Sequence, residues 1–428
     1  MTLRAFRGEL LSVPQDPRDA PDAVCHEPDG LLVVEDGRVV ARGAYETTLR
    51  SFPGVAVEKL PGLVVPGFID AHVHYPQTDC IASYGEQLLD WLDTHIFPAE
   101  KAFADKDHAA EVAAFFLDEL LRNGTTSALV YPTVHEASVD ALFEAALERD
   151  MRIVSGKVLM DRGPEGLADT LASGRVATAA LIRRWRGRGR LGYAVTPRFA
   201  LASSDAQLAD AGALLSEYPE VLMHTHLSEN IHEIAAVAAR FPDSTDYLDV
   251  YDRFGLVTAR SVFAHGVHLS DRACSRLRSS GAGVAVCPSS NLFLGSGHFD
   301  FGQADRHGLR LGLGTDIGAG TSFSMLQTAG LAYQAALARE DRLDPFRALY
   351  LATAGSAGLL RIGDRVGSLQ PGQEADFVVL DCAATPLLAR RTANADLATR
   401  LFALQILGDE RAIARTYVMG RCAWKRTP

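Results

Sequence analysis

The feature that most constrains the fold is a regular alternation of short apolar runs, rich in Val, Ile and Leu, with longer segments of helical composition. Eight such units within roughly 250 residues match the size of a parallel (β/α)₈ barrel. We therefore predict an α/β protein built on a TIM barrel. The predicted barrel strands are Pro66–His74, Thr126–Pro132, Met151–Leu159, Leu191–Phe199, Val221–Leu227, Ser261–Gly266, Gly283–Pro288 and Leu309–Asp316.

The two ends of the chain show β patterns of a different kind. Residues 1–65 contain GLLVVEDGRVVARG, in which apolar and polar residues alternate around an Asp-Gly turn. The segments SLQPGQEADFVVLD and RTYVMGRCAWK give similar signals near the C-terminus. We predict that residues 1–65 and 365–428 form one small composite β-sandwich domain, which braces a barrel formed by residues 66–364.

Composition and charge narrow the class of function. The chain has 428 residues, of which 47% are hydrophobic, so it can bury a large core. Its formal net charge of −11 disfavours a nucleic-acid partner, because binding phosphates requires a basic face. The Arg-rich run at 183–190 is interpreted as a solvated helix end. A small-molecule partner fits the composition better.

Cysteine spacing and hydropathy indicate the compartment. The six cysteines include no CxxC pair, which argues against a zinc ribbon, a redox motif or a dense disulfide framework. No run of eighteen apolar residues could span a membrane, and MTLRAFRGEL lacks the apolar segment of a signal peptide. We expect a cytoplasmic protein that does not associate with membranes.

Polar residues cluster where the predicted barrel strands end. Barrel enzymes carry their chemistry at the C-terminal ends of their strands, so these side chains are expected to gather at one rim. The residues concerned are His72, His74, Arg198, His226, His265 and Asp316.

A metal site is the strongest chemical hypothesis for this rim. His72 and His74 lie two residues apart in a strand, so their side chains point to the same side and can bind one ion. With His226 and Asp316 they supply three imidazoles and one carboxylate, which suits a hydrolytic zinc or iron ion with one position left for water. A single strand histidine is more often a buried, hydrogen-bonded residue, but this combination favours ligands.

Two further residues fit proton transfer and charge stabilisation. Glu229 follows His226 by three residues, where its carboxylate could carry protons to a ring nitrogen and a leaving group. Its alternative role is a helix-start glutamate that interacts with the helix dipole. His265 could polarise the water or stabilise a tetrahedral intermediate. We expect His224 to be a packed core histidine.

Seven segments carry a more specific resemblance: PGFIDAHVHYPQ, LLDWLDTHIFPAE, TPRFALAS, HTHLSE, VFAHG, CPSSNLFLGSG and LGTDIGAGTSFSML. In this order, from about residue 59 to residue 380, they resemble the amidohydrolase superfamily and, within it, the guanine deaminases. HxH and GTD are shared with many amidohydrolases, whereas HYPQ, WL…FPAE and TPRF are narrower. The resemblance implies hydrolytic deamination of guanine to xanthine and ammonia, one zinc ion per subunit with iron as the alternative, and a homodimer.

The resemblance also implies roles for individual residues. The four ligands above would hold the zinc ion, and Asp316 would accept a proton from the attacking water. Glu229 would deliver protons to N3 and to the departing amino group. Gln77, Arg198 and Phe199 match the family's substrate contacts, and an amide with a guanidinium suits the carbonyl edge of guanine. On resemblance alone, the segment from Trp91 to Glu100 forms a lid or a subunit contact.

Several alternatives remain open at this stage. A related aminohydrolase or chlorohydrolase acting on another purine, a pterin or a triazine would share the same metal site. A two-metal cyclic amidase needs a lysine at the end of the fourth strand, where this chain has TPRF. A cytidine-deaminase-like fold needs PCxxC, which the chain lacks. A non-catalytic barrel is disfavoured because no ligand is missing. Ser289 and Asn291 either border the pocket or are ordinary loop residues.

Overall fold

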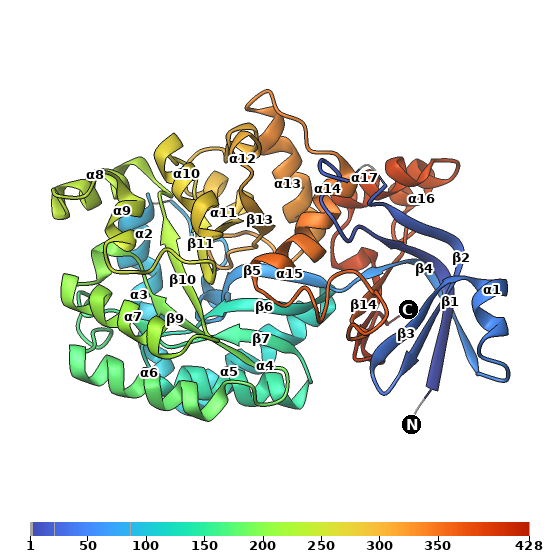
Figure 1. The fold of residues 1–428 in the computed structure, drawn as a ribbon, viewed down its shortest axis with the longest axis horizontal. Helices are drawn as coiled ribbons and strands as arrows, with labels where there is room; N and C mark the ends of the chain where they lie inside the picture. Colours follow the sequence, from blue (N-terminus) through green and yellow to red (C-terminus); the bar gives the residue numbers. More distant parts are fainter. Residues whose placement is uncertain (1–2, 21, 86, 428) are drawn as a thin grey trace.

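The computed structural model describes residues 3–20, 22–85 and 87–427, in which eight parallel strands form a nearly closed barrel (Figure 1). Their order is β13-β12-β11-β10-β9-β7-β6-β5, and a short additional strand pairs with β9. This confirms the fold class predicted from the sequence. The strands are β5 (Phe68–His74), β6 (Thr125–Tyr131), β7 (Arg152–Ser155), β8 (Val158–Leu159), β9 (Gly192–Pro197), β10 (Leu222–Leu227), β11 (Ser261–His265), β12 (Gly283–Val286) and β13 (Arg310–Leu313).

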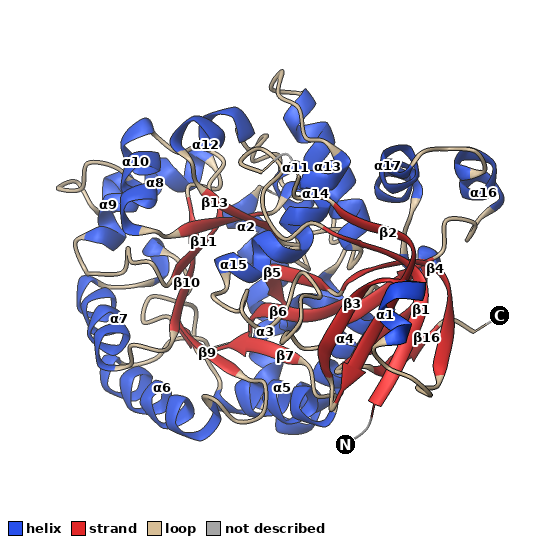
Figure 2. Ribbon diagram, turned by 45° about the vertical axis from the view of Figure 1, so that its right-hand side comes forward, coloured by secondary structure: helices blue, strands red, loops and turns tan. Residues whose placement is uncertain are grey.

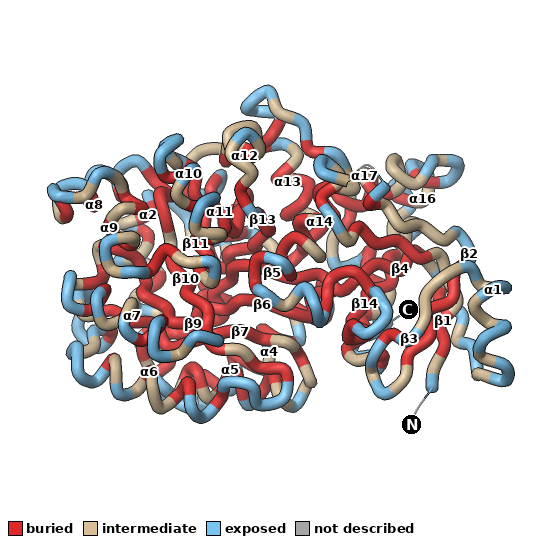
Figure 3. Tube along the Cα trace, viewed as in Figure 1, coloured by how far each residue is buried: buried red, intermediate tan, exposed pale blue. Residues whose placement is uncertain are grey.

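Helices cover the outside of the barrel (Figure 2). The tube in Figure 3 shows the barrel strands almost entirely buried, and exposure is concentrated on the outer helices and loops. The larger helices around the barrel are α4 (Lys106–Arg122), α5 (Glu136–Glu148), α6 (Leu171–Trp185), α7 (Asp205–Glu217), α8 (Ile231–Arg240), α10 (Asp271–Ser280) and α13 (Met325–Leu337). Shorter helices are α2 (Leu88–Trp91), α3 (Phe97–Lys101), α9 (Tyr247–Asp252), α11 (Pro288–Phe293), α12 (Phe301–His307), α14 (Pro345–Tyr350) and α15 (Ser356–Leu359).

Six of the eight predicted strands end within two residues of the observed bounds, and the other two differ more. The third predicted strand is divided into β7 and β8 at Gly156, where a Cβ would lie 1.8 Å from the Ala194 carbonyl oxygen. The last strand ends at Leu313, so Asp316 lies in the loop beyond it rather than at its final position. Neither change moves a predicted site residue away from the C-terminal rim.

The barrel closes at that rim through a short backbone seam. The Asp316 N–H donates to the His72 carbonyl oxygen at 2.9 Å, and the His74 N–H donates to the Ile317 carbonyl oxygen at 2.9 Å. A Cβ at Gly314 would lie 2.9 Å from the same His72 oxygen, so glycine permits this close approach. The first strand and the loop after the last strand are therefore held in register.

The remaining strands form a separate sheet from both ends of the chain, with the order β16-β15-β14-β4-β1-β2-β3. Its core includes Phe6, Phe377 and Tyr417, whose ring centroids lie 4.3–5.3 Å apart. Where exactly the two domains divide stays a prediction. The strands are β1 (Leu3–Ser12), β2 (Cys25–Glu35), β3 (Arg38–Ala44), β4 (Val57–Pro66), β14 (Phe377–Leu380), β15 (Ile413–Val418) and β16 (Arg421–Lys425), with helices α1 (Tyr45–Arg50), α16 (Pro386–Thr392) and α17 (Leu397–Leu407) beside them.

The predicted Asp-Gly hairpin is confirmed by the backbone. Asp36 and Gly37 join β2 to β3 with φ values of 47° and 82°. Positive φ at both central residues is the geometry that favours an Asp-Gly pair in a two-residue hairpin loop. No helix within the described residues is long and apolar enough to cross a membrane.

A buried ion-pair network joins the sheet to the barrel. Arg152 and Arg190 on the barrel side both pair with Glu374, and Arg190 also pairs with Asp376. The interpretation of the Arg183–Arg190 run as a solvated helix end is therefore wrong for Arg190, whose side chain is only 7% exposed. The pattern of charges along the sequence could not show that Glu374 and Asp376, far away in the chain, would pair with Arg190.

Replacing Glu374 with glutamine tests this network. We expect the free energy of unfolding to fall by roughly 3 kcal/mol, because breaking a buried ion pair leaves guanidinium charge uncompensated. Urea unfolding followed by fluorescence measures the loss. The control is Arg421→Gln, which breaks a pair with Asp150 in which the arginine is 68% exposed; that pair is worth about 1 kcal/mol or less. Equal losses in the two variants would contradict the proposed importance of burial.

Candidate active site

The structure brings the four predicted ligands together at the rim. His72 and His74 project from β5, His226 from β10, and Asp316 from the loop after β13. The Nε2 atom of His74 lies 3.2 Å from Nε2 of His72 and 3.2 Å from Nε2 of His226. The Asp316 Oδ1 atom lies 3.1 Å from His72 Nε2 and 3.3 Å from His74 Nε2.

The chemistry of these groups suits a metal ion. The His226 Nδ1 atom donates to the Arg198 carbonyl oxygen at 2.7 Å, so the lone pair of that ring is on Nε2, facing the other histidines. Burial lowers the pKa of His72 and His226, and lowers that of His74 to about 3, which keeps the rings neutral. Neutral imidazoles converging with a carboxylate form a donor set suited to a divalent ion.

Asp316 is held as a carboxylate. Burial alone would raise its pKa, but its close contacts with the His72 and His74 rings hold the pKa well below the usual value. Its backbone has a φ of 54°, in the left-handed region, and His265 has a φ of 72°. Such conformations cost side-chain-bearing residues about 1–2 kcal/mol, so the surrounding structure stabilises an unfavourable backbone at both positions.

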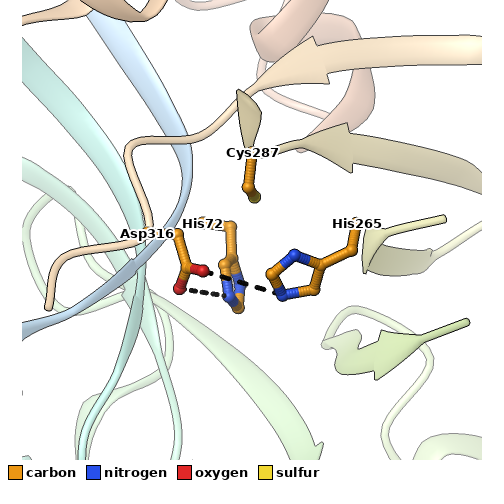
Figure 4. A group of neighbouring side chains, drawn as sticks. All are labelled: His72, His265, Cys287 and Asp316. Carbon is orange, nitrogen blue, oxygen red and sulfur yellow. Dashed lines mark ion pairs between the residues drawn. The ribbon is translucent and has the colours of Figure 1, made fainter. Parts of the chain in front are cut away.

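His265 faces the same group from the end of β11 (Figure 4). Its Nε2 atom lies 3.7 Å from Asp316 Oδ2 and 3.4 Å from Glu229 Oε2. Its Nδ1 atom lies 2.9 Å from the side-chain oxygen of Asn291, which orients the ring. Asn291, for which the sequence left pocket and loop roles open, therefore contacts a predicted catalytic residue.

Cys287 is a neighbour that the sequence did not predict for this site. In Figure 4 its side chain points toward His72, His265 and Asp316. The potential ligand atoms of these four residues lie within 4.8 Å of one another. Burial raises the pKa of the Cys287 thiol well above its usual value, and the thiolate is the form that binds metals. Cys287 is therefore a poorer ligand than the histidines.

Glu229 lies beside these residues, in an environment that favours the protonated form of its carboxyl group. Burial raises its pKa well above the usual value, and the nearby charges of Glu233 and Asp316 add to that effect. Glu233 is itself fixed by hydrogen bonds from the Glu229 N–H at 3.0 Å and the Tyr247 hydroxyl at 2.7 Å. A carboxyl group that carries a proton near neutral pH can act as a general acid.

A pocket opens onto the predicted catalytic groups. Apolar walls with a few converging polar groups are typical of small-molecule sites. Its lining includes all three residues predicted to contact substrate, together with apolar side chains of α2 and neighbouring loops. The lining residues are His74, Gln77, Leu88, Trp91, Leu92, Arg198, Phe199, His226, Glu229, Glu233, His265, Leu294, Asp316 and Ala319.

The polar end of this pocket is organised by a residue to which the sequence gave no catalytic role. Glu100 accepts hydrogen bonds from Arg198 Nη1, at 2.9 and 2.6 Å, and from Gln77 Nε2, at 3.2 Å. It is only 1% exposed. The segment from Trp91 to Glu100 contributes Trp91 to the pocket lining, and its Glu100 contacts the lining residues Gln77 and Arg198. Its role as a lid or a subunit contact stays a prediction.

Two further buried residues, His224 and Asp70, contact the predicted ligand His72. His224, expected to be a core histidine, is buried, but its Nε2 atom lies 2.7 Å from His72 Nδ1. Asp70 accepts the backbone N–H groups of His72 at 3.2 Å and Thr315 at 3.0 Å. The alternation in HTH could have indicated His224, since His226 points the same way, two residues along the strand.

Comparison with known proteins identifies the family of this chain. The model of the amidohydrolase family matches residues 63–423. A guanine deaminase from Escherichia coli K12 is 47% identical over 432 residues, covering 99% of this chain and 98% of its own. The solved structure of E. coli guanine deaminase superposes with a TM-score of 0.96 at 45% identity, covering 100% of both chains.

A third relative carries a ligand. Guanine deaminase from C. acetobutylicum, solved with guanine bound in its active site, superposes with a TM-score of 0.90. It is 27% identical and the match covers 98% of this chain and 100% of that one. From the family match and the full-length identity, the chain belongs to the amidohydrolase family and, within it, to the guanine deaminases.

Proposed function

We propose that this protein hydrolyses guanine to xanthine and ammonia. The observation that carries this proposal is the meeting of three parts in one pocket: a three-histidine, one-carboxylate cluster, the raised-pKa carboxyl of Glu229, and the Gln77–Arg198 pair. The full-length similarity to a guanine deaminase supports the choice of ring.

We assign the metal as one zinc ion per subunit, held by His72, His74, His226 and Asp316. Three neutral imidazoles with one carboxylate suit zinc, and iron is the alternative that the same ligands accept. The ion would lower the pKa of a water molecule and so supply a nucleophile near neutral pH. His224 and the Arg198 carbonyl contact the second ring nitrogens of His72 and His226, which fixes the orientation of both rings.

The residues around the pocket would move the protons. Asp316, held ionised, accepts a proton from the attacking water. Glu229 gives its proton to ring N3, regains one from the attacking water, and delivers that proton to the amino group on C2 as the C–N bond breaks and ammonia leaves; the proton held by Asp316 then restores Glu229. His265, whose Nε2 atom faces both carboxylates, stabilises the oxygen that gains negative charge at C2.

Substrate orientation would come from the opposite end of the pocket. Arg198 and Gln77 present N–H groups to the carbonyl edge of guanine, while Phe199 packs against the ring. A buried polar edge discriminates between rings strongly, because a ring that cannot pair with it leaves polar groups unsatisfied. The homodimer and the cytoplasmic location predicted from the sequence stay predictions.

A substrate panel tests the choice of ring. Purified protein loaded with zinc should release ammonia from guanine and form xanthine, measured by ammonia release and by the change in ultraviolet absorbance. Adenine, a pterin and an amino- or chlorotriazine complete the panel, and we expect turnover at least about 100-fold lower with each of them. If guanine is inert while another ring turns over, the proposed substrate is wrong.

Replacing Glu229 with glutamine tests its role in proton transfer. We expect kcat to fall by about 10²–10⁴-fold, because the amide cannot exchange a proton with the ring or the leaving group. Metal content, measured by atomic absorption, should stay at one ion per chain, because Glu229 is not among the assigned ligands. Near-normal turnover would remove Glu229 from the mechanism.

Metal removal tests the ligand set. Dialysis against a chelator should abolish activity, and added zinc should restore it. The variant His226→Ala should bind less than one ion per chain and stay inactive in added zinc, while His307→Ala, which removes an imidazole from the far end of α12, should bind one ion normally. A chelated protein that retains full turnover would rule out a metal-dependent mechanism.

A further inference from the structure

We propose that Glu100 is a positioning residue that determines which rings the pocket accepts. By orienting Gln77 and compensating the charge of Arg198, it creates an uncharged recognition edge made of hydrogen-bond donors only. This inference rests on the proposed function, since it concerns the same substrate site. It assigns a specificity role to the FPAE segment, which contains no residue that touches the metal cluster.

The position of Glu100 places it behind the recognition edge. It lies in α3, between β5 and β6, and is 1% exposed. Both of its carboxylate oxygens accept from one nitrogen of Arg198, Nη1, and Arg198 itself lines the pocket. The Arg198 guanidinium also lies over the Phe97 ring, 5.1 Å from its centroid, so helix α3 holds the arginine through two contacts.

The same carboxylate fixes which way the Gln77 amide faces. Gln77 Nε2 donates to Glu100 at 3.2 Å, and Gln77 Oε1 accepts the Gly318 N–H at 3.2 Å. A carboxylate can only accept and a backbone N–H can only donate, so the amide has one orientation. With Oε1 turned toward the Gly318 N–H, the second N–H of Nε2 is the group that we infer donates to a ring.

A donor-only edge has a direct consequence for selectivity. A ring that presents a carbonyl oxygen or an unprotonated ring nitrogen pairs with these N–H groups. A ring that carries an amino group at that position places its own N–H donors against the N–H donors of the pocket. The buried polar groups then stay unsatisfied. Glu100 compensates the positive charge of Arg198, so an anionic ring gains little electrostatic attraction there. Loss of the Glu100 charge would leave the buried guanidinium uncompensated, and it would then attract an anionic ring.

The variant Glu100→Gln separates this role from general damage, because it keeps the shape and removes the charge. We expect the KM for guanine to rise roughly tenfold or more, with kcat changing less, because the charge-assisted hydrogen bonds of Glu100 orient the side chains of Gln77 and Arg198. Urate, an anionic oxopurine at neutral pH, should in contrast bind more tightly than to the unmodified protein, by roughly tenfold. Urate binding is measured by calorimetry on the metal-loaded protein.

Two further variants make the comparison specific. Glu374→Gln makes the same chemical change at another buried, arginine-paired carboxylate, outside the pocket, and should leave both the guanine KM and urate binding unchanged. Glu100→Asp keeps the charge, so urate binding should stay as weak as in the unmodified protein although the guanine KM rises. If Glu100→Gln does not fold, the Glu100→Asp result alone decides, and tighter urate binding in that variant overturns the proposal.

The proposal is also overturned if Glu100→Gln weakens guanine and urate binding by the same factor, changes neither, or is matched by Glu374→Gln. Urate binding requires no turnover, so this test stands apart from the guanine panel. An unmodified protein that fails to deaminate guanine refutes the proposed function, whereas an unchanged urate affinity in Glu100→Gln refutes the role of Glu100.

Discussion

The site depends on the backbone seam that closes the barrel. Where the Asp316 N–H meets the His72 carbonyl and the His74 N–H meets the Ile317 carbonyl, three of the four assigned ligands belong to the closing hydrogen bonds themselves. Asp70 bonds the backbone on both sides of the seam, at His72 and Thr315, and burial raises its pKa to about 7. The residues that close the barrel at this rim therefore also supply most of the cluster.

Arg198 connects the two halves of the pocket. Its carbonyl oxygen accepts from His226 Nδ1 and from the Tyr131 hydroxyl, while its side chain reaches Glu100 at the recognition end. The backbone of one residue thus orients an assigned metal ligand, and its guanidinium is a group that we propose to bind the ring. A displacement of Arg198 would therefore disturb both the recognition of the ring and the orientation of His226. This one residue couples substrate binding directly to the chemistry.

How much the sequence could predict depends on whether the partners are close along the chain. The strand-final HxH, the apolar runs and the Asp-Gly hairpin are local patterns with direct structural meaning, so the barrel and the cluster followed from them. Glu100 carries no local signal, because its role arises only when α3 packs near Arg198, 98 residues later in the chain. Arg190 was misinterpreted for the same reason, since Glu374 and Asp376 cover it from the other end of the sequence.

The residues proposed for catalysis and those proposed for substrate recognition lie in different parts of the chain, which suggests how such a site can change its substrate. The assigned ligands and Glu229 lie at the strand ends or just beyond them, so substitutions there remove the proposed chemistry. Gln77 and Glu100 instead lie in the segment between β5 and β6, outside the strand ladder. That segment can alter the donors offered to a ring while the catalytic cluster stays intact. Selectivity is therefore the more adaptable property, and the paired carboxylate behind Arg198 is the position where one side chain determines both the charge and the hydrogen-bonding direction of the pocket.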